Sequence, residues 1–133
     1  MKKQSGFKIS FSLFRIFMAI LMIIHGIARI YYDSIIGFGQ FLNEKGFYIG
    51  LYLAYAITIF EIMGGLFIIF GKFSKLIAPF FMIELLMGVI LVHANFGWFV
   101  VGHSSNGVEY SLCLILCFFL IWAEDYFKPA DPN

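Results

Sequence analysis

The sequence predicts an all-α membrane protein, a bundle of four transmembrane helices in a single domain of residues 1–133, with both termini in the cytoplasm. Hydrophobic residues make up 62% of the chain and charged residues only 13%, whereas about 25% of a typical soluble domain is charged. Four apolar stretches are each close to the roughly 20 residues that a helix needs to cross a bilayer. They are residues 9–32, 47–70, 76–95 and 108–126.

The first predicted helix, residues 9–32, carries Arg15, His25 and Arg29 in an otherwise apolar stretch. An arginine near the centre of a membrane helix costs roughly 2.5–3.5 kcal/mol, so these side chains need partners or a function. At about 100° per residue, Arg29 lies roughly 40° and His25 roughly 80° from Arg15 around the helix, with Gly26 in the same arc. This stripe either pairs with acidic residues on other helices or lines a ligand or proton site.

The connection formed by residues 33–45 contains Ile35, Ile36 and Phe38, which suggests that it lies on the membrane surface. In the second predicted helix, residues 47–70, Glu61 is the single charged residue. The same helix contains adjacent glycines, and small residues let membrane helices pack closely. The residues expected to provide such helix packing are Gly26, Gly64 and Gly65.

The third predicted helix, residues 76–95, carries Glu84 and, near its end, His93. Aromatic residues and a polar turn follow, which indicates an interfacial hairpin before the fourth helix. That helix, residues 108–126, has Glu109 at its start. His93 is nine residues after Glu84 and so lies half a turn away from it, which leaves open whether His93 faces the bundle or the loop.

The lysines predict the orientation, because cytoplasmic loops of membrane proteins carry an excess of Lys and Arg. With both termini in the cytoplasm, the outer side holds Lys45, and every other lysine falls on the inner side. The inner lysines are Lys2, Lys3, Lys8, Lys72, Lys75 and Lys128. The expected location is a bacterial cytoplasmic (inner) membrane.

Depth in the membrane, estimated at about 1.5 Å per residue, sorts the charged side chains into two groups. A buried polar cluster contains Arg15, Glu61 and Glu84. An outer-side polar cluster contains His25, Arg29, His93 and Glu109. Opposite charges at matched depth stabilise each other in lipid, so we expect a buried ionic contact between Arg15 and Glu61.

The order and spacing of these motifs resemble the DoxX family of four-helix membrane proteins, over nearly the whole chain. The motifs are Arg15, His25-Gly26-x-x-Arg29, Glu61-x-x-Gly64-Gly65 with Gly71, His93-x-x-Phe-Gly97-Trp-Phe, and Gly107-x-Glu109-Tyr110. Two departures stand out, because Arg29 replaces a common lysine, and residues 123–126 replace a glycine-rich end. The resemblance implies a membrane subunit of a quinone-linked or thiol-stress redox system.

Several functions stay open at this point. A small transporter or channel and a non-catalytic membrane assembly factor are the alternatives to a redox subunit, and haem ligation by His25 and His93 is a further one. A quinone is the cofactor that a protonatable group in the membrane suggests, whereas no motif for a flavin, an iron–sulfur cluster or a metal is present. The expected partners are the lipid bilayer and either a partner subunit or a second copy of the chain. Nucleic-acid binding has no support, because no basic face is present.

Overall fold

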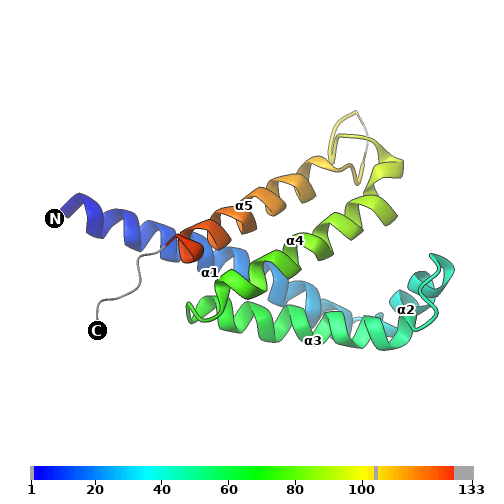
Figure 1. Cartoon of the computed structure of the whole chain (residues 1–133). Coiled ribbons are helices and arrows are strands. Elements are labelled where there is room, and N and C mark those ends of the chain that lie inside the picture. Colours follow the sequence, from blue (N-terminus) through cyan, green and yellow to red (C-terminus); the bar gives the residue numbers. More distant parts are fainter. Residues whose placement is uncertain (1, 104, 128–133) are drawn as a thin grey trace. The chain divides into compact units, whose positions relative to one another are not determined.

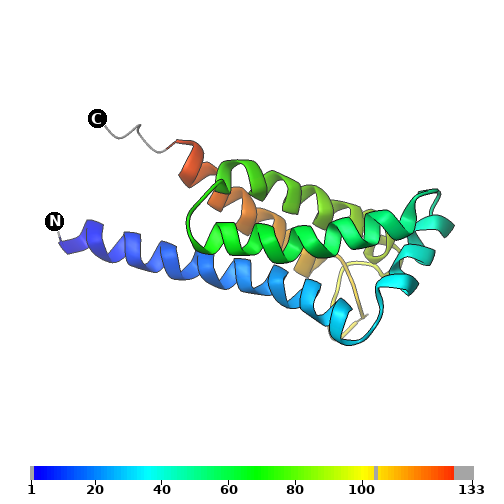
Figure 2. The same cartoon turned by 90° about the horizontal axis from the view of Figure 1, so that it is seen from below.

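The computed structural model describes residues 2–103 and 105–127, and all regular structure in these ranges is helical. The chain divides into two compact units, Met1–Lys72 and Phe73–Asn133. Each unit is described by itself below. Figures 1 and 2 show the helices of each unit from two directions.

The first unit is a pair of long helices with a short helix at one end. Helix α1 (Lys2–Tyr31) and helix α3 (Gly50–Ile69) run antiparallel and side by side in both views (Figures 1 and 2). The buried face of α1 includes Met18, Ala19 and Met22, which are at most 3% exposed. The opposite faces of both helices carry exposed Ile, Leu and Phe side chains, as expected for contact with lipid.

The connection predicted for residues 33–45 is largely a helix, α2 (Ile35–Glu44), which packs on α3. Its buried residues are Gly39 and Leu42, three apart and therefore on one face. Gly39 permits this contact, because a Cβ there would lie 2.8 Å from the Leu51 Cα atom. Asn43 Oδ1 accepts a hydrogen bond of 2.8 Å from the Gly50 backbone N–H, which ties the end of α2 to the start of α3.

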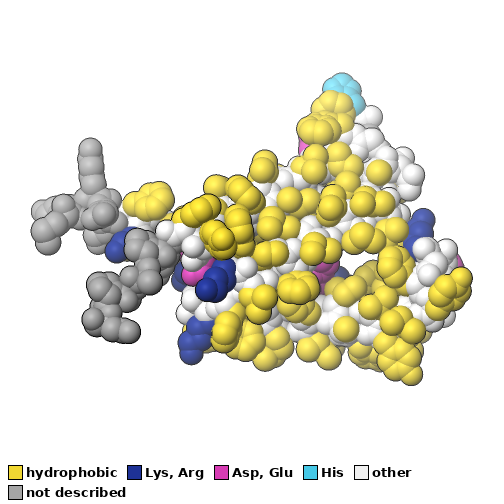
Figure 3. Space-filling model, viewed as in Figure 1, with side chains coloured by type: hydrophobic (Ala, Val, Ile, Leu, Met, Phe, Trp, Pro, Cys, Tyr) yellow, Lys and Arg dark blue, Asp and Glu magenta, His cyan; other side chains and the backbone are white. Residues whose placement is uncertain are grey.

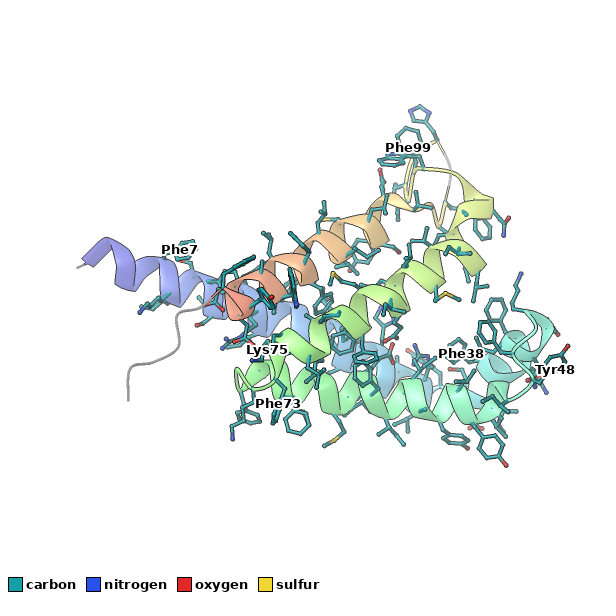
Figure 4. The ribbon with its side chains drawn as sticks, viewed as in Figure 1. Phe7, Phe38, Tyr48, Phe73, Lys75 and Phe99 are labelled. Atoms are coloured by element: carbon teal, nitrogen blue, oxygen red, sulfur yellow. The ribbon has the colours of Figure 1, made fainter. Side chains whose placement is uncertain are left out.

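The second unit consists of helix α4 (Ser74–Leu91), the short 3₁₀ helix η1 (His93–Phe96) and helix α5 (Glu109–Tyr126). Helices α4 and α5 pack against each other through Phe81 and Phe118, whose ring centroids are 5.0 Å apart. Phe99 lies in the loop between η1 and α5, at the end of the helix pair where α4 ends and α5 begins (Figure 4).

Three of the described helices are long and apolar enough to cross a membrane: α1 from Gly6 to Tyr31, then α3 and α4. Helix α5 has similar length but carries three carboxylates near its ends, Glu109, Glu124 and Asp125. Hydrophobic side chains cover much of the surface visible in Figure 3. The chain is therefore an all-helical membrane protein, while the fourth span and the orientation of the termini stay predictions.

Candidate functional site: a buried ion pair between α1 and α3

The site is a pair of opposite charges inside the first unit. Arg29 of α1 donates two hydrogen bonds to the Glu61 carboxylate of α3, from Nη1 to Oε2 and, at 2.8 Å, from Nη2 to Oε1. The Glu61 side chain is 2% exposed and the Arg29 side chain 19%. A planar guanidinium matches a carboxylate in this two-bond geometry, which is the strongest arrangement available to such a pair.

Two neighbours complete the surroundings of the pair. Thr58, one turn before Glu61 on α3, accepts a hydrogen bond of 3.3 Å from Arg29 Nη1 and donates one of 2.7 Å to the carbonyl of Ala54. The Phe38 ring lies 4.7 Å from the Arg29 guanidinium carbon, a cation–π contact. Figure 4 shows Phe38 on the side of α2 that faces the two long helices. Helix α2 thus covers one side of the ion pair.

Glycines set the register that brings the two charges together. A Cβ at Gly26 would lie 2.7 Å from Ile62 Cγ1, and one at Gly65 would lie 2.5 Å from Ile23 Cγ1. Each glycine therefore receives an isoleucine of the other helix, and the backbones approach closely. In this register Arg29 reaches Glu61, and the turn after α3 lies beside Arg15.

The predicted contact between Arg15 and Glu61 is wrong, because Glu61 pairs with Arg29 instead. The depth estimate assumed that the predicted stretches 9–32 and 47–70 end at the same level. In the structure, the glycine contacts place one helix further along the other than that estimate assumed. The Arg15 guanidinium consequently lies beside Gly71, about ten residues or about 15 Å beyond Glu61. Glu61 and Arg29 were assigned to different clusters, and the structure brings these two together.

The remaining residues of the outer-side cluster are His25 in the first unit and His93 and Glu109 in the second. His25, one turn before Arg29, is exposed on α1. His93 belongs to the loop, because its Nδ1 lies 2.7 Å from the Asn106 carbonyl oxygen and must donate a proton to it. Glu109 accepts a hydrogen bond of 2.9 Å from the Val100 backbone N–H and thereby holds the same loop.

Glu84 lies on α4, in the second unit, so its grouping with Arg15 and Glu61 stays a prediction. Gly64 is buried within α3 beside Gly65. In the described ranges, no group of three or more His, Cys, Asp or Glu side chains is arranged as a metal site. The chemistry of the site is accordingly that of a guanidinium, a carboxylate and a hydroxyl group.

The family model of DoxX matches residues 10–94, which is more than half of the chain. The chain belongs to the DoxX family. The matched range of this DoxX protein runs from α1 to η1 and includes Arg29, Thr58 and Glu61. Searches of the curated proteins and of the solved structures give no match.

Thr58 and Phe38 are parts of the site that the sequence reasoning missed. A threonine in a membrane helix, three residues before the single carboxylate of its stretch, was a usable signal, because both side chains then lie on one face. Phe38 was assigned to a connection on the membrane surface, and nothing in the sequence indicated that its ring would cover Arg29.

Proposed function

We propose that this DoxX protein is a membrane subunit of a redox system and that its ion-pair site binds a quinone headgroup. The observation that carries the proposal is a buried Arg29–Glu61 pair one helical turn from the exposed imidazole of His25, on a helix apolar enough to span a membrane. Ionisable groups within membrane helices usually serve a function.

The residues fit the chemical needs of a quinone headgroup. Such a group presents two carbonyl oxygens, which need hydrogen-bond donors, and an apolar tail, which needs contact with lipid. Arg29 has five N–H groups, of which three form the bonds to Thr58 and Glu61, and His25 offers a further ring N–H. Exposed Ile24 and Ile27 on α1 provide apolar surface beside His25.

The chain's own residues would have separate roles. A quinone, when bound, supplies the transfer of electrons and protons between the membrane and a partner protein. Arg29 orients a carbonyl oxygen by hydrogen bonding, and Glu61 keeps the guanidinium in place. His25 offers a ring nitrogen as a hydrogen-bond donor to the second carbonyl oxygen.

The test is the quinone content of the purified protein. The protein is extracted from its own membrane in mild detergent, and bound quinone is quantified by chromatography and mass spectrometry. We expect near-stoichiometric quinone in the wild type and in Glu44→Gln, an exposed control on α2, and at least a tenfold loss in His25→Phe. Absence of quinone from the wild type, or full retention in His25→Phe, would refute the proposal.

A second candidate is a non-catalytic assembly protein, in which the ion pair only fixes helix packing. The tight contacts at Gly26 and Gly65 favour it, because they and the pair hold α1 and α3 in one register. Under this alternative, Glu61→Gln lowers stability or assembly with partners, and His25→Phe changes neither. Comparing these two variants therefore separates the two functions.

A further inference from the structure

A second basic site lies at the opposite end of the α1–α3 pair from α2. The Arg15 guanidinium rests against the turn that ends α3, where a Cβ on Gly71 would lie 3.1 Å from Nη2 and 3.2 Å from Nη1. Gly71 has a positive φ of 67°, so glycine suits this position both for its backbone and for the space it leaves. The Arg15 side chain thus lies at the end of the helix pair where α3 ends.

Arg15 lacks a side-chain partner among the described residues of the first unit. Its Nε atom is buried without a hydrogen bond, and the ion pair of this unit joins Arg29 to Glu61 instead. The carboxylates of the first unit are elsewhere, because Glu61 bonds to Arg29, Asp33 follows the C-terminal end of α1, and Glu44 is the last residue of α2. A buried donor without an acceptor costs about 1–3 kcal/mol, which indicates that an acceptor from outside this unit completes the site.

Two further basic residues lie at the same end of the α1–α3 pair as Arg15. Lys8 is seven residues before Arg15, so it lies within about 20° of it around α1 and about 10 Å further along the axis. Lys72 directly follows Gly71, and both lysines are exposed. The first turns of α1 extend beyond the end of α3 in Figures 1 and 2. The basic residues at this end of the unit, Lys8, Arg15 and Lys72, are called the ledge below.

Exposed apolar side chains are found at the same end of the helix pair as the ledge. Phe7 is 68% exposed at the start of α1, where Figure 4 shows it, and Phe70 is 71% exposed at the end of α3. The surface therefore combines anion-binding groups with a surface for acyl chains, at the level where a membrane helix pair ends.

We propose that this ledge binds the phosphate of an anionic phospholipid, with Arg15 as the main ligand and Lys8 and Lys72 as supporting charges. A guanidinium binds phosphate oxygens through two parallel hydrogen bonds. Basic residues at the ends of membrane helices are known to select anionic headgroups in this way. A lipid, rather than free phosphate, fits because the exposed Phe7 and Phe70 adjoin these basic residues in the chain.

The test measures lipid selectivity in the intact protein. Delipidated protein in detergent is titrated with phosphatidylglycerol or phosphatidylcholine of identical acyl chains, and binding is followed by native mass spectrometry. We expect the wild type to bind phosphatidylglycerol at least tenfold more tightly than phosphatidylcholine, and Arg15→Gln to bind both equally. Lys45→Gln, which removes a cation from the opposite end of the unit, should keep the wild-type preference.

Defined outcomes would overturn the proposal. Equal affinity of the wild type for both lipids, or an unchanged preference in Arg15→Gln, means that the ledge does not select the headgroup. Displacement of phosphatidylglycerol by millimolar inorganic phosphate would assign the site to the free anion instead. If Arg15→Gln fails to fold, Arg15→Lys replaces it, and the proposal requires a preference weakened about three- to tenfold, because lysine lacks the two-bond geometry.

Discussion

Replacing Glu61 by Gln tests the ion pair most directly. Gln has nearly the same volume and keeps one acceptor, so the packing of α3 is preserved while the charge is removed. Arg29 would then remain part-buried with Thr58 and Phe38 as neighbours and without a counter-charge. Breaking a buried pair in this way costs about 3–5 kcal/mol. Because 19% of the Arg29 side chain stays exposed, we expect the lower end, about 3 kcal/mol.

The assay is unfolding in mixed micelles with increasing sodium dodecyl sulfate, followed by far-UV circular dichroism. Helix content is the right signal, because Trp98 and Trp122 both lie in the second unit and their fluorescence would not report directly on α1 and α3. Glu44→Gln, at the exposed end of α2, is the control and should stay within about 0.5 kcal/mol of the wild type.

A double-mutant cycle completes this test. Arg29→Met combined with Glu61→Leu removes both charges and keeps apolar volume, and such replacements are often neutral. The double variant should therefore be more stable than either single variant, with an interaction energy of at least about 2 kcal/mol. A Glu61→Gln variant indistinguishable from Glu44→Gln, or a cycle without interaction energy, would show that the two charges do not act as a pair.

Three further predictions concern packing and the loops. Gly65→Ala should lose about 1–3 kcal/mol in the same unfolding assay, because its Cβ would lie 2.5 Å from an isoleucine of α1, whereas Gly88→Ala, with open space around it, should be neutral or slightly stabilising. Asn43→Ala removes the acceptor for the Gly50 N–H and should cost about 1 kcal/mol, seen as faster hydrogen exchange at the α2–α3 junction. Glu109→Gln weakens a charge-assisted bond of 2.9 Å to the preceding loop and should raise proteolytic cleavage there roughly fivefold.

Each of these has a clear contrary result. Equal stability of Gly65→Ala and Gly88→Ala would mean that α1 and α3 are not in close contact. Unchanged exchange in Asn43→Ala would show that α2 is held by packing alone. A cleavage rate of the wild-type value in Glu109→Gln would remove the hydrogen bond to Val100 as the restraint on the loop.

The membrane helices could be predicted from the sequence, because length and apolarity determine which stretches can cross a bilayer. The family could be predicted from the order and spacing of the motifs. The predicted stretch 47–70 corresponds to α3, Gly50–Ile69, within a few residues. Helix α2 was missed because Gly37 and Gly39 lower the helix propensity of this segment. Packing on α3 outweighs that propensity, since the missing Cβ at Gly39 is what allows the two helices to touch.

The pairing of charges was predicted wrongly, because the ends of an apolar stretch are a poor landmark for its position along a neighbouring helix. Depth counted from the ends of each stretch placed Arg15 near Glu61, and a shift of about three turns changed the partner to Arg29. The usable landmark was the fit of Gly26 to Ile62 and of Gly65 to Ile23. Aligning Gly26 with Gly64 in an antiparallel pair would also have placed Arg29 opposite Glu61, because each charge is three residues from its glycine.

The spacing of the ion pair along the chain has a consequence for biosynthesis. Arg29 is made 32 residues before Glu61, so at about 5–20 residues per second its counter-charge is synthesised about 2–6 s later. Over that interval a nascent α1 carries an unneutralised guanidinium that opposes its entry into lipid. The cost is below the about 2.5–3.5 kcal/mol of a central arginine, because Arg29 lies in the last turn of α1. Helix α1 therefore gains its full stability in the membrane only when α3 follows it, and the two helices are best inserted together as one hairpin.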